Sequence, residues 1–379
     1  RWQEGRTVSG KDEDALIATG HSEVMTDGLD HLEDRYRGIE EETRGGGDSE
    51  KTGGIIAYFS AEIGLQSDLP TYSGGLGVLA GDHIKAAADN GLDLVAITLL
   101  YRHGYGRQHL DVDGNQSETF PAFDPRKILK DTGIDISIPL DGKSLYSRIW
   151  KYTVKSEFGG DVNVLFLDTA HPDNDNIHSD LGSRLYGGGE ETRIRQEYLL
   201  GIGGIRALKT LGLWPLKGLH LNEGHCAFAA LEMLQQGWSR EELARRCLFT
   251  SHTPVPAGHD HFAWGEVETI LGERLPGDIR TKLGGETCSM SHLAAQLAGK
   301  VNAVSKLNAV VAGEMFPTTT VHPITNGVHH LTWVGPAMQE IYDEFLPDWR
   351  TNPGELRKSQ RIPDRELVSA RNKSRTILH

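Results

Sequence analysis

The strongest chemical signal in the sequence is the glycine-rich segment Tyr72–Asp82, which contains Gly74, Gly75, Leu76 and Gly77. Glycines let a ligand approach the backbone closely, and amides at a helix N-terminus attract phosphate or hydroxyl oxygens. We therefore expect this loop to run into a helix and to bind such a ligand. A tight turn without a ligand is the alternative interpretation.

The same segment formally matches the dinucleotide-binding fingerprint, as Gly75-x-Gly77-x-x-Ala80. A genuine fingerprint follows directly on a strand, and an acidic residue comes about twenty positions later. Here residues 66–72 intervene, and the next apolar run ends in Tyr101-Arg102 instead of a carboxylate. The sequence therefore does not predict a dinucleotide site.

A second cluster of polar residues, Asn222, Glu223 and His225, follows an apolar run directly. Open α/β sheets bind ligands at the carboxyl ends of their strands, so these side chains are expected to bond to sugar hydroxyls or to one another. Helix capping by Asn222 alone is the alternative. His220, His225 and Cys226 have neither HExxH nor CxxC spacing, so no metal site is predicted.

His252 follows a further apolar run and is our candidate catalytic residue. Two prolines, Pro254 and Pro256, prevent a regular helix after it and restrict its loop, which holds the imidazole in one orientation. A single loop histidine is more often structural. Polar ends of two separate strands at the same sheet edge, however, favour a shared site.

Two arginines, Arg193 and Arg195, stand near the start of an expected helix. They either bind phosphate or pair with the neighbouring Glu190 and Glu191, and for Arg195 we favour pairing.

These clusters need a framework, and alternation of short apolar runs with helical patterns predicts an α/β fold around a largely parallel sheet. Strands are expected at residues 55–60, 94–100, 162–167, 218–221 and 247–251, and helices at 82–90, 191–211, 225–236, 291–302 and 305–315. Two apolar runs around a central turn predict an inserted hairpin near residues 134–154.

The chain divides into three expected regions. Residues 1–53 form a helical arm, with an apolar helix face at 25–39, and end in a glycine-rich joint. Residues 54–333 form the main α/β domain. Residues 334–379 form a polar helical segment.

Composition restricts the class of partner. A net charge of −14 argues against nucleic acid and anionic membranes as partners, so a neutral ligand fits better. The apolar runs are too short to cross a bilayer and no signal peptide is recognisable, so we expect a cytoplasmic protein. The cysteines Cys226, Cys247 and Cys288 are scattered and predict buried thiols, not a disulfide framework.

Seven separated strings resemble, in the same order, those of the α-glucan (glycogen, starch or maltodextrin) phosphorylases, in their compact prokaryotic form. The resemblance covers roughly residues 55–340. The strings are Tyr58–Glu62, Ser73–His83, Leu100–Gln108, Arg193–Glu197, Leu221–His225, Ser251–Gly258 and Thr325–His329.

The resemblance implies the Rossmann-like N-terminal domain of a two-domain GT-B glycosyltransferase, with the active site between the domains. Inorganic phosphate would cleave the terminal bond of an α-1,4-glucan to give glucose 1-phosphate with retention. Pyridoxal phosphate would act through its phosphate group. A homo-oligomer is compatible with this family.

The same resemblance implies roles for the candidate residues. The segment Gly74–Gly77 would offer amides to phosphate, His252 would contact the glucosyl unit, and Asn222, Glu223 and His225 would support the sugar side. One departure is Gly187–Gly189, where many relatives carry an acidic or amide residue in the loop that gates the site.

The lysine that carries the cofactor belongs to a C-terminal domain to which nothing in this chain corresponds. The chain starts at Arg1 and ends at His379 without a closing strand, so we expect a fragment that is inactive by itself. Two alternatives remain: a GT-B glycogen or starch synthase-like glucosyltransferase, against which the strings around Asn222 and His252 argue, and a non-catalytic glucan-binding half-domain.

Overall fold

The computed structural model describes residues 54–255 and 258–378, and all structural statements below concern these residues. They belong to one compact unit, Gly54–His379. The helix expected at residues 25–39 and the glycine-rich joint lie outside the described residues, as do Pro256 and Ala257 of the loop after His252.

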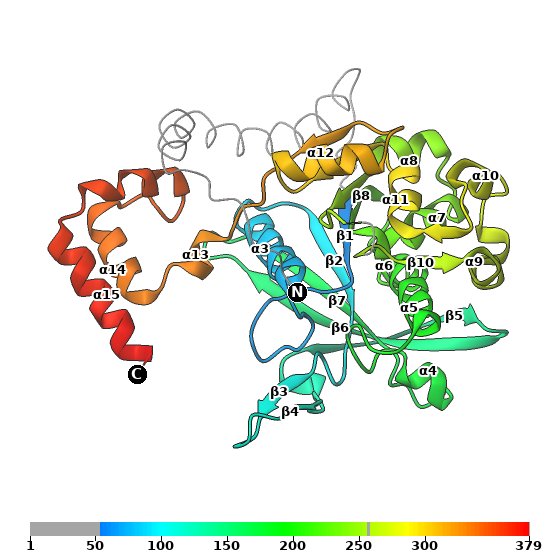
Figure 1. The fold of residues 1–379 in the computed structure, drawn as a ribbon, viewed down its shortest axis with the longest axis horizontal. Helices are drawn as coiled ribbons and strands as arrows, with labels where there is room; N and C mark the ends of the chain where they lie inside the picture. The colour runs from blue at the N-terminus through cyan, green and yellow to red at the C-terminus, as the bar shows by residue number, and fades with distance from the viewer. Residues whose placement is uncertain (1–53, 256–257, 379) are drawn as a thin grey trace, which may run out of the picture. The chain divides into compact units, whose positions relative to one another are not determined.

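A nine-stranded sheet organises the described part of the chain, in the order β13-β12-β9-β8-β1-β2-β7-β6-β5 (Figure 1). Seven neighbouring strands, β13 to β7 in this order, pair in parallel, and β6 and β5 continue the sheet antiparallel. This confirms the predicted α/β class. The strands are β1 (Ile55–Ser60), β2 (Leu94–Leu99), β5 (Lys130–Leu140), β6 (Lys143–Lys155), β7 (Asp161–Asp168), β8 (Leu216–Asn222), β9 (Cys247–Ser251), β12 (Lys300–Ala303) and β13 (Val321–Pro323).

The segment expected to form a hairpin lies within β5 and β6, which pair antiparallel. Asp141 and Gly142 connect the two strands with φ values of 51° and 74°. Positive φ at both central residues is the geometry of the tight hairpin turn that Asp-Gly favours. Because β6 also pairs with β7, the hairpin widens the main sheet.

Helices follow most of the strands. They are α3 (Gly75–Asp89), α4 (Asn176–Asp180), α5 (Glu190–Tyr198), α6 (Gly204–Thr210), α7 (Ala227–Gln235), α8 (Arg240–Arg246), α9 (Trp264–Leu271), α10 (Ile279–Leu283), α11 (Met290–Leu297) and α12 (Lys306–Met315). A π-helical turn, Leu199–Gly203, joins α5 to α6.

Two expected helix boundaries were wrong. Helix α3 begins at Gly75 instead of residue 82, because Gly74 is extended and caps a helix whose first turn contains the glycines themselves. Helix α11 ends at Leu297 instead of residue 302. Ala298 is extended, and Gly299 follows in a position where a Cβ would lie 1.5 Å from the carbonyl oxygen of Ala244, so only glycine fits before β12.

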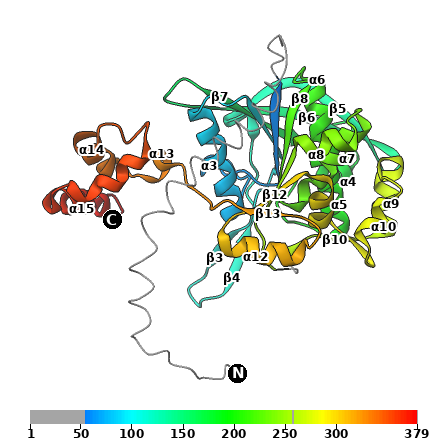
Figure 2. The same ribbon diagram turned by 90° about the horizontal axis from the view of Figure 1, so that it is seen from above.

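Both faces of the sheet are covered, as is usual for parallel sheets. Alternate residues of β1 point to opposite sides: Phe59 packs in one apolar cluster with residues of α6, α7 and α11, and Tyr58 packs in another with Ala80 and Ile84 of α3. Figure 2 shows α3 on one side of the sheet and α5, α6, α7 and α8 on the other. The free cysteines Cys226, Cys247 and Cys288 are buried, as predicted.

The C-terminal segment is helical and has a small apolar cluster of its own, centred on Leu346, Trp349 and Ile362. It contains α13 (His330–Trp333), α14 (Pro336–Phe345), a run of 3-10 turns (Pro353–Arg361) and α15 (Asp364–Leu378).

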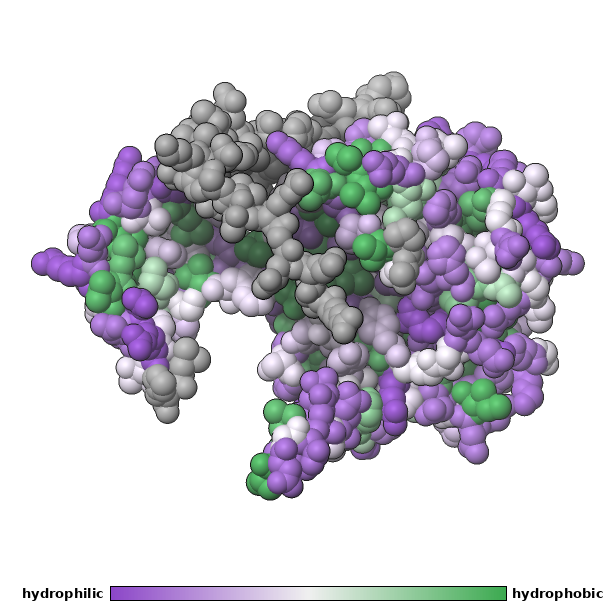
Figure 3. Space-filling model, viewed as in Figure 1, coloured by the Kyte–Doolittle hydropathy of each residue, from purple (hydrophilic) through white to green (hydrophobic). Residues whose placement is uncertain are grey.

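Two short ribbons lie outside the main sheet: β3 (Arg107–Leu110) with β4 (Gln116–Thr119), and β10 (His261–Ala263) with β11 (Thr287–Ser289). The tip of the β3–β4 ribbon exposes apolar surface, which Figure 3 shows at its end; the exposed side chains there are Leu110 and Val112. No helix in residues 54–255 and 258–378 is long and apolar enough to cross a membrane.

Candidate functional site

The predicted site residues meet at the carboxyl ends of β1, β8 and β9. These strands are adjacent, and their register pairs Ser60 with Asn222 and Asn222 with Thr250. The three loops that follow therefore begin at the same level of the sheet. This brings together Asn222 and His252, which are thirty positions apart in the chain.

His252 and Asn222 are joined directly. The His252 Nε2 lies 2.7 Å from the Asn222 Oδ1, and the Asn222 Nδ2 donates to the Ser60 Oγ at 3.0 Å. With its amide nitrogen turned to Ser60, Asn222 offers its oxygen to the imidazole N–H. Burial lowers the pKa of His252 to about 4, so the ring is neutral at pH 7. The bond to Asn222 thus holds the imidazole in one orientation, an effect that the sequence analysis ascribed to Pro254 and Pro256.

Glu223 shapes the loop that carries His252. One carboxylate oxygen accepts the amides of His252 at 2.8 Å and Thr253 at 3.1 Å, and the other accepts the amide of Gly224 at 3.2 Å. Burial raises the pKa of the Glu223 carboxyl. The backbone of Glu223 has a φ of 76°, which is unusual for a residue with a side chain, and such strain concentrates at functional sites. Glu223, not Asn222, caps the 3-10 turn that follows β8.

His225 lies buried just behind this loop. Burial, with a smaller contribution from Arg193, lowers the pKa of its imidazole to about 3. Its Nε2 has no hydrogen-bond partner among the described residues. A buried, neutral ring nitrogen without a partner is costly and needs a reason. The structure places His225 beside the other predicted residues, but its buried Nε2 makes no hydrogen bond within the described residues.

The glycine segment forms the amide end of α3. The amides of Ser73 and Gly74 donate to the Glu62 Oε2 at 2.7 and 3.3 Å. The amides of the first helical turn have no partner within the helix, and none of the hydrogen bonds found in the described residues involves those of Gly75, Leu76 and Gly77. A Cβ at Gly74 or Gly75 would meet nothing within 4 Å, so this end is open to a ligand.

Glu62 lies among the candidate site residues, and sequence reasoning missed it. It is buried, lies two residues after β1, and its second oxygen accepts the Tyr186 hydroxyl at 2.6 Å. The string Tyr58–Glu62 carried the family resemblance but received no role. The available signal was an acidic residue just after a strand and just before a glycine-rich segment.

A cluster of largely buried charged side chains around Arg193 contacts these loops. The Arg193 guanidinium bonds to Asp260 at 2.8 Å and lies 5.0 Å from the centre of the Tyr186 ring. Burial and the nearby Asp260 raise the pKa of Glu197 well above its usual value. Arg195 instead pairs with Asp141 at 2.7 Å. Pairing was therefore the right expectation for Arg195, although its main partner comes from the β5–β6 turn.

Comparison with known proteins shows what the chain is similar to. No protein-family model matches the chain. It is 38% identical to the maltodextrin phosphorylase of Thermococcus litoralis over 355 residues, 84% of this chain and 42% of that protein. The glycogen phosphorylases of Mycobacterium tuberculosis and Aquifex aeolicus are 37% and 30% identical, over 76% and 86% of this chain and 38% and 51% of those proteins.

This chain is an α-glucan phosphorylase-like protein. The phosphorylase-like chain spans about half the length of the curated relatives it matches, or less.

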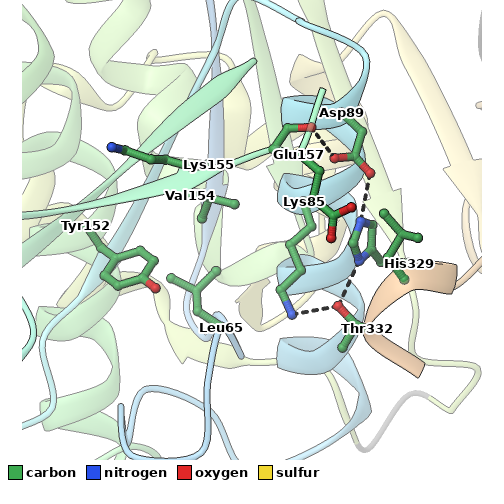
Figure 4. A pocket seen from close by; sticks show the side chains of 11 residues that line it. Leu65, Lys85, Asp89, Tyr152, Val154, Lys155, Glu157, His329 and Thr332 are labelled. Carbon is green, nitrogen blue, oxygen red and sulfur yellow. Dashed lines mark hydrogen bonds and ion pairs between the residues drawn. The ribbon is translucent and has the colours of Figure 1, made fainter. Parts of the chain in front are cut away.

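A cavity of about 280 Å³ in the phosphorylase-like chain lies at the other end of α3 (Figure 4). Lys85, Asp89, Tyr152, His329 and Thr332 are among its lining residues, and none of the predicted site residues lines it. In the described parts of the chain, no group of His, Cys, Asp or Glu side chains is arranged to hold a metal ion.

Proposed function

We propose that this chain is the Rossmann-like N-terminal domain of an α-1,4-glucan phosphorylase with GT-B architecture. In the whole enzyme, inorganic phosphate would replace the terminal glycosidic oxygen at the anomeric carbon. Glucose 1-phosphate would leave with retained configuration, together with a glucan one unit shorter. The similarity to maltodextrin and glycogen phosphorylases supports this proposal.

One observation carries the proposal: a chain of contacts joins the imidazole to the amide end of α3. His252 bonds to Asn222, Asn222 to Ser60, and the Ser60 hydroxyl to the carbonyl of Glu62. The carboxylate of that same Glu62 holds the amide of Gly74. A neutral imidazole suited to sugar hydroxyls and open amides suited to phosphate therefore belong to one hydrogen-bonded unit.

Each candidate residue has a task in this proposal. The amides of Gly75, Leu76 and Gly77 hold phosphate oxygens, because a helix N-terminus offers both donors and a positive potential. His252 bonds to the glucosyl unit in the orientation that Asn222 sets. Glu223 keeps the backbone of the His252 loop in place.

The family implies pyridoxal phosphate, and the described residues fit only part of that group. The amide end of α3 fits a phosphate group of either the cofactor or the substrate. The candidate site residues include no lysine that forms an imine with the aldehyde. The cofactor would supply a phosphate that exchanges a proton with the substrate phosphate.

Phosphate-dependent release of glucose 1-phosphate from maltodextrin or glycogen tests the proposal. The assay uses the protein that contains this chain at its full natural length, with and without added phosphate. Transfer of glucose from a nucleotide sugar, with no phosphate dependence, would show that the synthase-like alternative is correct. Binding of glucan without either reaction would favour the half-domain alternative.

Substituting His252 with alanine tests the candidate catalytic residue. We expect kcat/KM to fall about a hundredfold or more, since polar contacts that strengthen in the transition state are typically worth this much. The melting temperature should change by only a few degrees, because the imidazole makes one side-chain hydrogen bond. His109→Ala, in the exposed β3, is the matched control. An unchanged rate would remove His252 from the site.

A further inference from the structure

Glu62 is a buried acidic residue whose hydrogen-bond donors come from other segments of the chain. Its side chain is only 3% exposed, and burying an ionised carboxylate is costly unless donors compensate for it. Three donors do so: the amides of Ser73 and Gly74, and the hydroxyl of Tyr186. None of the three belongs to β1, the strand that precedes Glu62. The carboxylate therefore joins two other segments of the chain.

The first segment is the start of α3. By taking the amides of Ser73 and Gly74, Glu62 fixes the direction in which the chain enters the helix, and the next three amides are left to point outward. A negative charge at this end also matches the helix dipole. Gly77 permits the close approach, because a Cβ there would lie 2.8 Å from the Glu62 Oε2.

The second segment is the loop that begins at Tyr186 and continues through Gly187–Gly189. Tyr186 has a φ of 56°, which is strained for a bulky residue, and its side chain is 39% exposed. Two contacts keep it in place: its hydroxyl donates to Glu62, and its ring lies beside the Arg193 guanidinium. Tyr186 and Glu62 are 124 positions apart in the chain.

We propose that Glu62 is a positioning residue for phosphate binding, which aligns the open amides of α3 and, through Tyr186, fixes the neighbouring loop. This inference rests on the proposed function, which places phosphate at that end. Glu62 is not a ligand itself, because both of its oxygens face protein donors and a carboxylate turned toward phosphate would repel it. It acts through the backbone that it holds.

Glu62→Gln tests the inference in the full-length enzyme. The substitution keeps the shape but places an NH2 group against donors. We expect the KM for phosphate to rise about tenfold to a hundredfold, the range for losing charge-assisted hydrogen bonds. The KM for glucan should stay within about threefold. A rise in both KM values together with a lower melting temperature would indicate a merely structural role and overturn the proposal.

Tyr186→Phe separates the two contacts. It removes one hydroxyl and leaves the bonds to Ser73 and Gly74, so the KM for phosphate should rise less, about threefold to tenfold. Because the hydroxyl acts through Glu62, adding Tyr186→Phe to Glu62→Gln should change little further. Fully additive effects would overturn the coupling. If Glu62→Gln is insoluble, an unchanged KM in Tyr186→Phe alone would overturn it as well.

Amide hydrogen exchange distinguishes failure of this inference from failure of the proposed function. In the full-length protein, Glu62→Gln should speed exchange at Ser73 and Gly74 at least tenfold, whereas Tyr186→Phe should leave them slow. If the native enzyme shows no phosphorolysis, the proposed function fails, and the exchange result still decides whether Glu62 holds this end. Equal exchange in native and Glu62→Gln protein would overturn the positioning role.

Discussion

The two ends of helix α3 are built in opposite ways. At its start the backbone is open: glycines leave the first amides accessible, and no acceptor among the described residues takes them. In its second half Asp82, Lys85 and Asp89 are bonded, whereas the buried Nε2 of His83 has no partner among the described residues. Asp82 accepts the His329 amide at 3.1 Å and the Trp333 indole at 2.6 Å, Lys85 donates to Thr332 at 3.1 Å, and Asp89 lies 2.8 Å from the His329 imidazole.

The difference teaches how to separate structural from functional polar groups on one element. The bonded side chains at one end attach the helix to residues 329–333, so no ligand is needed to account for them. Asp89, the last residue of α3, opposes the helix dipole, and the His329 imidazole beside it compensates. The first-turn amides at the other end have no protein acceptor among the described residues, so water or a ligand can bind them. The cavity beside the bonded end (Figure 4) therefore does not mark the candidate site.

The largest expected effect comes from changing glycines within α3. A Cβ at Gly81 would lie 1.8 Å from the Gly64 carbonyl oxygen, so Gly81→Ala should cost about 3 kcal/mol of unfolding free energy. A Cβ at Gly75 meets nothing, so Gly75→Ala should stay within about 1 kcal/mol but weaken phosphate binding. Urea unfolding measures the stability of both variants, and phosphate titration measures their affinity for phosphate. A destabilised Gly75→Ala protein would contradict an open amide end.

Asp82→Ala breaks the bonded end. It leaves the His329 amide and the Trp333 indole without their acceptor, and we expect a loss of about 2 kcal/mol in unfolding free energy. Phosphate affinity should change less than twofold, since the amide end is untouched. Asp82→Asn, which keeps one acceptor oxygen, is the control and should lose less. A large drop in phosphate affinity would show that the two ends are not independent.

A pH effect sharpens the comparison on the site side. The pKa of His252 is lowered from 6.5 to about 4 by burial, so between these pH values the unfolded chain binds a proton that the folded one does not. The stability is therefore complete above pH 6.5 and is lost as the pH falls toward 4. His252→Gln should flatten the slope by up to about 1.4 kcal/mol per pH unit. Urea unfolding at pH 7, 6 and 5 measures it, and an unchanged slope would refute this burial argument.

The smallest effect is expected from Lys85→Ala. Lys85 is half-buried beside the cavity and donates to the hydroxyl of Thr332 alone among the described hydrogen bonds. Losing one such bond should change the unfolding free energy by less than about 0.5 kcal/mol. Thermal unfolding measures this. A loss as large as that of Asp82→Ala would mean that the bonded end depends on its lysine and not on its carboxylates.

Much of the fold was predictable because short-range patterns determine it. The five expected strands are present, since apolar β-branched runs bounded by turns form strands that a parallel sheet buries. The start of α3 was not predictable. Glycine disfavours helix, and only packing against Gly64 and Glu62 stabilises the helical conformation of these glycines. The strand β12 was missed because Val301 and its neighbours are stabilised by pairing with β9 and β13.

The sequence by itself determined which residues end the strands: Asn222, Glu223 and His252 follow apolar runs directly, and parallel strands present such ends at one edge. Only the tertiary structure decided which partners they have. The bond between His252 and Asn222 follows from the register of β8 and β9, and the contact of Glu62 with Tyr186 joins residues 124 positions apart. Local patterns carry no information about hydrogen bonds that form only when distant strands and loops are brought together.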